Sequence, residues 1–247
     1  MLYPIKRSIF LILLLATLTA SAQDTTFFDN HFQKVYALQD CEFYVVSFRD
    51  SPEANKTTEK VYSKFGQIQS EQTFVSLLNN QQQRNRIYDG KFKTWYPNGL
   101  LHEDIDYSNG KKNGKLLTYW ETGIHKREDV YVDGKLSSGK CFNRSGNDTN
   151  YYAYESIPQF PGGIEKYKEY LINGLSSAGN TTEGIVIVQF AIAKDGSIIN
   201  IKVVQSANEE LDKKAIAIIE KMPNWIPAYQ DGIPKVYTQR QGITFKK

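Results

Sequence analysis

A repeat of about 24 residues runs through the middle of this 247-residue chain and constrains its fold more than any other feature. Two series of glycines mark the repeat: Gly90, Gly114 and Gly139, spaced by 24 and 25 residues, and Gly99, Gly123 and Gly146, spaced by 24 and 23 residues. A fixed period of this length indicates that similar supersecondary units stack side by side. The repeat therefore predicts an extended array of small units in this part of the chain.

Asn-Gly and Asp-Gly pairs separate the segments within each unit, as at Asn98-Gly99, Asn109-Gly110 and Asp133-Gly134. Such pairs supply the positive φ angles that tight hairpin turns need. Each unit is therefore predicted to be a hairpin, with strands such as 91–97 and 100–108, and the units together form a long antiparallel meander. We expect the polar stretch 79–86 to be a surface loop inserted into the repeat.

Aromatic residues recur with the same period, because Trp95 and Tyr96 correspond to Tyr119 and Trp120. A thin meander has no thick core, so its aromatic side chains are expected to pack on one another across neighbouring strands. An adhesive face for a partner protein is the alternative, and the sequence leaves both open.

The Gly-Lys-aromatic-Gly cores at 90–99 and 114–123 resemble the MORN-type repeats of YwqK-like antitoxin proteins. The resemblance covers about residues 60–148 and implies an architecture far more than an activity.

The period ends near residue 150, and a different order of elements follows. The hydrophobic pattern predicts a helix at 164–171, strands at 184–193 and 198–205 joined by a hairpin turn, a helix at 208–222 and a last strand at 235–245. In the second helix, Leu211, Ala215 and Ile218 fall on one face. This order is typical of two helices packed on a three-stranded antiparallel sheet. The fold class predicted for the chain is therefore α+β, with a β-meander before this small domain.

The C-terminal domain resembles the C-terminal domain of TonB energy transducers, in the variant common in Bacteroidetes-like proteins. The resemblance covers residues 156–247 and is carried by Pro158, the Phe160-Pro161-Gly162-Gly163 segment, the strand 184–192, Lys194-Asp195-Gly196, Met222-Pro223, Trp225, Pro227, Gly232 and Pro234. It implies a periplasmic domain that contacts TonB-dependent outer-membrane receptors, with a short receptor segment added as a strand to the edge of the last strand.

The resemblance assigns partner binding to six residues of that last strand: Val236, Tyr237, Thr238, Gln239, Arg240 and Gln241. Strand alternation puts Tyr237, Gln239 and Gln241 on one face and the other three on the opposite face. Lys235 and Arg240 would protect such an edge from uncontrolled association.

The sequence departs from the family pattern in two ways. A Tyr-Pro pair before the first strand is missing, since that region reads Asn173-Gly174-Leu175-Ser176-Ser177. Family transducers also have an N-terminal membrane helix that contacts the ExbB/ExbD motor, and usually a proline-rich spacer, whereas this chain has a signal-like N-terminus and only 8 unclustered prolines. Contact with ExbB/ExbD is therefore expected only if the N-terminus remains as a membrane anchor.

The N-terminal segment has the pattern of a secretory signal peptide. Lys6 and Arg7 precede an apolar run, and Ala20-Ser21-Ala22 supplies the small residues of a cleavage site. The uncharged stretch 8–23 is 16 residues long, which is shorter than the roughly 20 residues of a membrane-spanning helix. We therefore expect residues 1–22 to be removed and the protein to lie in the periplasm, with an uncleaved inner-membrane anchor as the alternative. In that oxidising compartment Cys41 and Cys141 either pair or remain as two half-buried thiols.

Composition and motifs give no support for an enzyme or a nucleic-acid-binding protein. The formal net charge is only +3, and the three histidines and two cysteines leave little material for a metal site. Glu103, Asp104 and Asp106 alternate with apolar residues as the solvated face of a strand would. No cofactor is expected.

The sequence thus predicts a signal peptide at 1–22, a MORN-like β-repeat domain at 23–148, a linker at 149–155 and a TonB-like domain at 156–247. The leading hypothesis is a periplasmic, non-enzymatic module of TonB-dependent transport that binds a receptor segment by strand addition. The alternatives are an envelope-assembly scaffold with no transport role and a true energy transducer with an uncleaved anchor.

We expect the mature protein to begin at Gln23, because signal peptidase requires small residues such as Ala20 and Ala22 before its cleavage site. Mass spectrometry of the N-terminal peptide from a periplasmic fraction checks this. Protein that starts at Met1 and stays in the inner membrane would favour the transducer.

Overall fold

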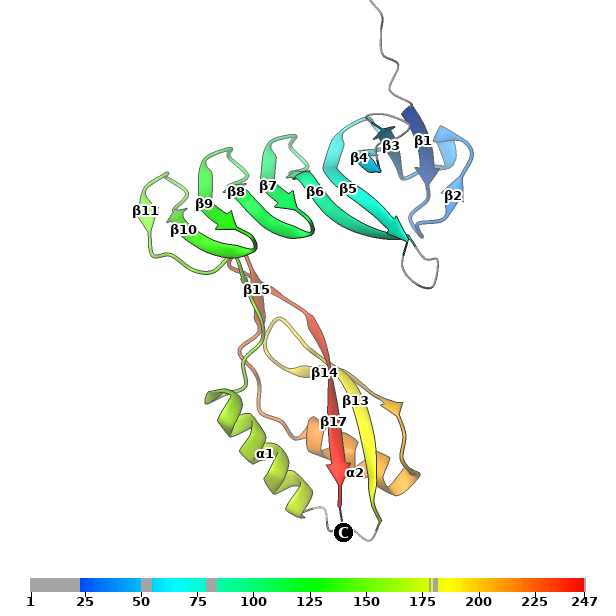
Figure 1. Ribbon diagram of the computed structural model, residues 1–247, viewed down its shortest axis with the longest axis vertical. Coiled ribbons are helices and arrows are strands. Elements are labelled where there is room, and N and C mark those ends of the chain that lie inside the picture. Colours follow the sequence, from blue (N-terminus) through cyan, green and yellow to red (C-terminus); the bar gives the residue numbers. More distant parts are fainter. Residues whose placement is uncertain (1–22, 50–54, 79–83, 178, 180–181, 247) are drawn as a thin grey trace, which may run out of the picture. The chain divides into compact units, whose positions relative to one another are not determined.

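The computed structural model describes residues 23–49, 55–78, 84–177, 179 and 182–246. The expected signal peptide lies outside these residues. The chain divides into two compact units between Tyr151 and Tyr152, within the stretch 149–155 that the sequence assigned to a linker. Strands in a long antiparallel meander and a small sheet with two helices confirm the predicted α+β class (Figure 1).

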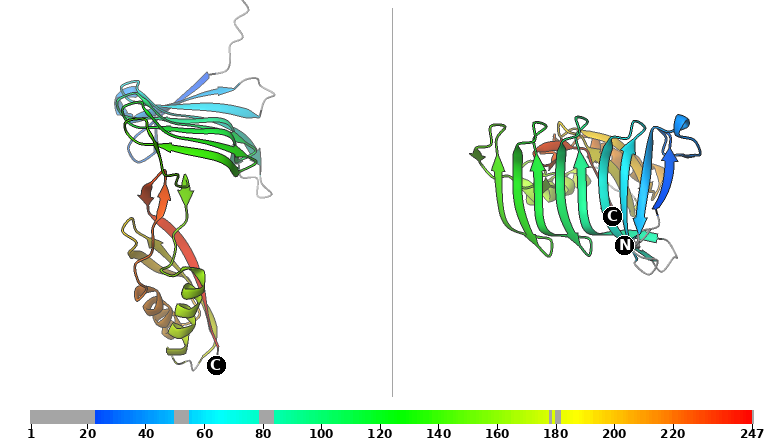
Figure 2. Two further views of the ribbon diagram at one scale, coloured as in Figure 1. Left: turned by 90° about the vertical axis from the view of Figure 1, so that its left-hand side faces the viewer. Right: turned by 90° about the horizontal axis from the view of Figure 1, so that it is seen from above.

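The first unit is one antiparallel sheet of 11 strands in the order β11-β10-β9-β8-β7-β6-β5-β4-β3-β1-β2. Figure 2 (right) shows its strands side by side in a single layer. The strand bounds are β1 Gln23–Phe28, β2 Lys34–Val35, β3 Phe43–Arg49, β4 Lys56–Ser63, β5 Ile68–Leu78, β6 Arg84–Trp95, β7 Leu101–Ser108, β8 Lys111–Tyr119, β9 His125–Val132, β10 Lys135–Phe142 and β11 Asp148–Thr149. A short 3-10 helix, η1 (Leu38–Asp40), precedes β3.

Glycines shape the turns on both sides of this sheet. Gly99 and Gly123 have φ angles of 83° and 82°, and each donates its N–H to a carbonyl three residues earlier. At the other side, Asn109 (φ 49°) and Gly110 (φ 77°) both have positive φ, as a type I′ turn requires. The repeat of the sequence is therefore a repeat of turn geometry.

The recurring aromatic residues join one unit to the next. Tyr96 Oη donates a hydrogen bond to the Tyr119 carbonyl oxygen at 2.8 Å, and one period later Trp120 Nε1 donates to the Phe142 carbonyl oxygen at 3.2 Å. Arg144 also lies over the Trp120 ring, 4.5 Å from its centroid. These contacts favour the packing role over the adhesive face.

The second unit packs α1 (Gly163–Ser177) and α2 (Glu209–Glu220) with an antiparallel sheet of order β14-β13-β17. Its strands are β13 (Gly184–Ile192), β14 (Ile198–Gln205) and β17 (Tyr237–Phe245). Asn208 caps α2, because its Oδ1 accepts the Leu211 N–H at 2.9 Å. The core contains Val186, Val188, Phe190 and Ile192 from β13, Leu211, Ala215 and Ile219 from α2, and Trp225.

A second small sheet of order β12-β15-β16 was not expected from the sequence. It consists of β12 (Glu155–Ser156), β15 (Ala228–Gln230) and β16 (Ile233–Lys235). Its strands have only two or three residues each, so they give no periodic signal.

Several expected element bounds are wrong. Pro234 and Lys235 belong to β16 and pair with Tyr229 and Ala228, so the last strand begins at Tyr237 and Val236 lies between the two sheets. Residues 84–86, expected in a surface loop, belong to β6 and pair with 76–78 of β5. Helix α1 continues past the predicted end to Ser177, and in this added part Gly174 lies close to Ile218 of α2.

The two cysteines do not pair. Cys41 precedes β3 and Cys141 lies in β10, and six strands, β4 to β9, separate β3 from β10 in the sheet. Both side chains are buried as free thiols.

We expect Trp225→Ala to lower the free energy of unfolding of the second unit by about 3–5 kcal/mol, because a buried ring is removed from the core. The first unit should keep its own transition, which scanning calorimetry of the full chain resolves. Trp120→Ala is the matched control and should lower only the transition of the first unit. One shared transition that both substitutions shift would contradict two independent cores.

Candidate partner-binding edge

Strand β17 pairs with β13 on one side, in a regular antiparallel register from Tyr237↔Ile192 to Phe245↔Gly184. On its other side, no strand pairs with it within the described residues. β17 is therefore an edge strand, and its free main-chain groups can accept another strand.

The two halves of β17 have different environments. Ile243 and Phe245 are buried in the core and anchor the end of the strand. Thr238 and Arg240 are exposed, whereas Gln239 and Gln241 are half-buried. Exposure therefore alternates from Thr238 to Gln241, as expected from the sequence. We call residues 237–241 the accessible half of β17, in contrast to the end of the strand that is anchored in the core.

Side chains hold the accessible half in place. Tyr167 Oη of α1 donates to Gln241 Oε1 at 2.7 Å, and Arg240 Nε donates to Gln189 Oε1 of β13 at 3.1 Å. The Tyr167 phenol is protonated at neutral pH and can donate this hydrogen bond, and burial raises its pKa to about 12, which keeps the proton in place at alkaline pH as well.

The structure places five of the six sequence-assigned residues on this edge strand: Tyr237, Thr238, Gln239, Arg240 and Gln241. Val236 precedes the strand and is exposed, so it does not contribute to the ladder with β13.

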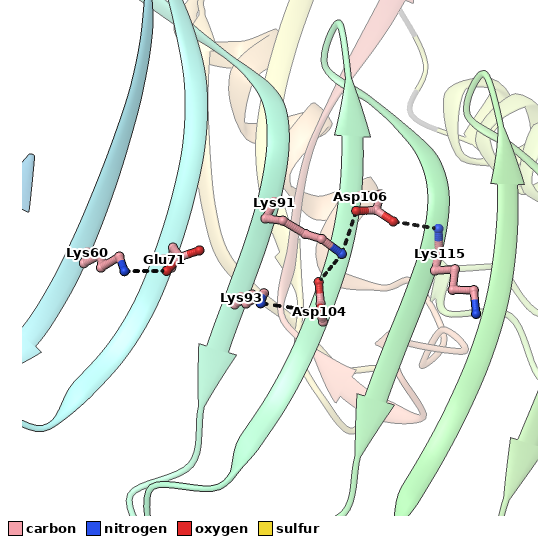
Figure 3. A network of polar contacts seen from close by, with 7 residues as sticks. All are labelled: Lys60, Glu71, Lys91, Lys93, Asp104, Asp106 and Lys115. Atoms are coloured by element: carbon pink, nitrogen blue, oxygen red, sulfur yellow. Dashed lines mark hydrogen bonds and ion pairs between the residues drawn. The ribbon is translucent and has the colours of Figure 1, made fainter. Parts of the chain in front are cut away.

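A polar network on the first unit is a second candidate for a binding surface (Figure 3). Lys91 Nζ lies 2.9 Å from Asp104 Oδ1 and 2.8 Å from Asp106 Oδ1, and Lys93 Nζ lies 3.7 Å from Asp104 Oδ2. Burial by itself lowers the pKa of Lys91, but the hydrogen bonds to Asp106 and Asp104 outweigh it and raise that pKa. The lysines and aspartates of neighbouring strands thus neutralise one another. This arrangement indicates a role in stabilising the sheet and not in binding a charged ligand.

One of the three carboxylates was wrongly expected on a solvated strand face. Glu103 is buried, and Thr94 Oγ1 donates to its Oε2 at 3.2 Å. It points to the opposite face of β7 from Asp104 and Asp106 because side chains alternate along a strand.

The described residues contain no group of three His, Cys, Asp or Glu side chains that could hold a metal ion. Within the same part of the chain, no helix is long and apolar enough to cross a membrane.

Residues 177–246 match the family model of the Gram-negative bacterial TonB protein C-terminal. The match contains β13, β14, α2 and β17 and supports the resemblance of the second unit to a TonB C-terminal domain, although the sequence resemblance began earlier, at residue 156. It associates the protein with TonB-dependent transport or with TonB-like proteins. No curated protein and no solved structure matches the chain.

We expect Tyr167 to make the second unit sensitive to alkaline pH. The pKa of Tyr167 is about 10 in the unfolded chain and about 12 in the folded protein. The unfolded chain therefore loses the phenol proton first, so the stability that the protonated Tyr167 gives the folded state is fully present below pH 10 and is lost as the pH rises to 12. Over that range the wild type should lose about 2–3 kcal/mol more stability than Tyr167→Phe, as measured by urea unfolding at each pH. Parallel stability curves would contradict this.

Proposed function

We propose that the protein is a periplasmic, non-enzymatic module that binds a segment of a TonB-dependent outer-membrane receptor by strand addition to β17. The observation that carries this proposal is that β17 is the edge strand of a TonB C-terminal domain, with an accessible polar half. Main-chain groups supply most of the affinity in this mode of recognition, and side chains supply the selectivity.

The anchoring of β17 supports this function. Ile243 and Phe245 hold one end in the core, and the ladder with β13 holds the whole strand in an extended conformation. A partner segment therefore meets an edge that is already ordered, and association needs little further ordering of this protein.

The repeat unit has a structural role in this proposal. We propose that its MORN-like hairpins form a stiff repeat domain, because their aromatic residues and ion pairs are used between neighbouring strands. ExbB/ExbD would be partners only if residues 1–22 were retained as an anchor.

The test compares proline with ordinary residues on β17. Successive N–H groups of a strand point to opposite edges, so of Thr238 and Gln239 one donates toward β13 and the other toward the free edge. Thr238→Pro and Gln239→Pro each remove one of these donors. Thr238→Val and Gln239→Thr are the matched controls, since they change the side chain and keep the donor.

Binding is measured by fluorescence anisotropy with 15-residue peptides that tile the N-terminal segments of TonB-dependent receptors from the same genome. Thermal unfolding followed by circular dichroism identifies the proline variant that keeps the fold. We expect that variant to lose at least tenfold in affinity and both controls to stay within about threefold. Equal binding by the folded proline variant, or no binding of any peptide by the wild type, would overturn strand addition.

A further inference from the structure

A cavity of about 380 Å³ lies beside the accessible half of β17. Phe160, Tyr167 and Trp225 line it and are nearly fully buried, whereas Ile157 and Ile164 line it and are well exposed. Gln239 of β17 also lines it, so the cavity adjoins the strand proposed to bind a partner. No charged side chain is among its lining residues, which favours an apolar occupant.

The cavity is held open by a fixed framework. The three rings contact one another, with centroids 5.1 Å apart for Tyr167 and Trp225 and 5.4 Å apart for Phe160 and Trp225. Gln159 and Ile226 exchange two main-chain hydrogen bonds of 2.9 Å each, which tie the segment before α1 to the segment that carries Trp225. The site is therefore preformed.

The polar groups of the wall do not require a polar ligand. Trp225 Nε1 is buried with essentially no exposed surface, so a molecule in the cavity does not reach it. The Tyr167 hydroxyl donates its hydrogen bond to Gln241. What the cavity presents to an occupant is therefore mainly the apolar surface of its rings and isoleucines.

The position of Gln239 relates the cavity to a bound strand. Side chains of an added strand alternate between the two faces of the sheet, and those on the helix side lie near Gln239. We propose, resting on the proposed function, that this cavity is the pocket that selects the partner segment by one large apolar side chain. Phenylalanine, leucine and methionine are residues of that description.

The test starts from a phage library of random ten-residue peptides selected on the full mature chain. The tightest peptide is then synthesised with Tyr, Met, Phe, Leu or Ala at each position in turn. At one position we expect Phe, Leu or Met to bind best and Ala to bind at least tenfold more weakly.

A spectroscopic signal reports whether the cavity is filled. The chain has three tryptophans, so a ¹H–¹⁵N spectrum of the mature protein shows three indole N–H signals, and Trp225→Phe identifies one of them. Binding of the tightest peptide should move the Trp225 signal, because the Trp225 ring lines the cavity, whereas the peptide with Ala at the selected position should leave that signal in place.

Two variants of exposed residues on α1 test whether the peptide binds at this cavity. Ile164 and Ile172 both lie on α1, with 62% and 61% of their surface exposed, but only Ile164 lines the cavity. Ile164→Glu places a charge at its mouth and suits the first turn of a helix. We expect it to weaken peptide binding at least tenfold, and Ile172→Glu, the matched control, to change binding less than twofold.

Peptides that bind with no preference for a large apolar residue, or equal binding by the two glutamate variants, would overturn the pocket and leave strand addition standing. A library that yields no binding peptide would overturn both.

Discussion

The packing of Trp225 is the interaction on which the second unit depends. Its ring contacts Phe160, Tyr167 and Phe190, and its main-chain N–H donates to the Gly196 carbonyl oxygen at 2.9 Å. One residue thus joins the segment before α1, helix α1, strand β13 and the turn between β13 and β14. Gly196 must be glycine, because a Cβ there would collide with the Trp225 carbonyl oxygen. The strand edge and the cavity beside it exist only while these segments are held together.

The first unit is stabilised in a different way, because a sheet that forms a single layer cannot bury a thick core against a second layer. Its stability comes from main-chain ladders, from cross-strand pairs and from the contacts that each hairpin makes with the next. On one face lysines alternate with Asp104 and Asp106, and on the other Arg127 pairs with Asp129 at 3.0 Å in a fully buried position. Both ends of the sheet are two-residue strands, and very short edge strands are one way in which natural sheets limit pairing with another chain.

Different parts of strand β17 serve stability and recognition. Burial of Ile243 and Phe245 fixes the strand, and the polar residues before them leave the edge soluble but accessible. The exposed Arg240 limits uncontrolled pairing between copies of the protein. A binding edge of this kind needs a selective element beside it, since main-chain hydrogen bonds distinguish partners poorly.

The sequence by itself determined the features whose physical cause is local. Positive φ angles are accessible to Gly99 and Asn109 without help from distant residues, so the hairpins could be placed from turn residues alone. The hydrophobic pattern likewise located β13, β14 and α2. Only the tertiary structure decided that Val236 lies outside β17, that α1 extends past Gly174, and that a cavity forms beside Gln239. Each of these depends on segments that meet in space after about 40 or more intervening residues, as Ile192 meets Tyr237 and Gly174 meets Ile218, and no local pattern encodes such a meeting.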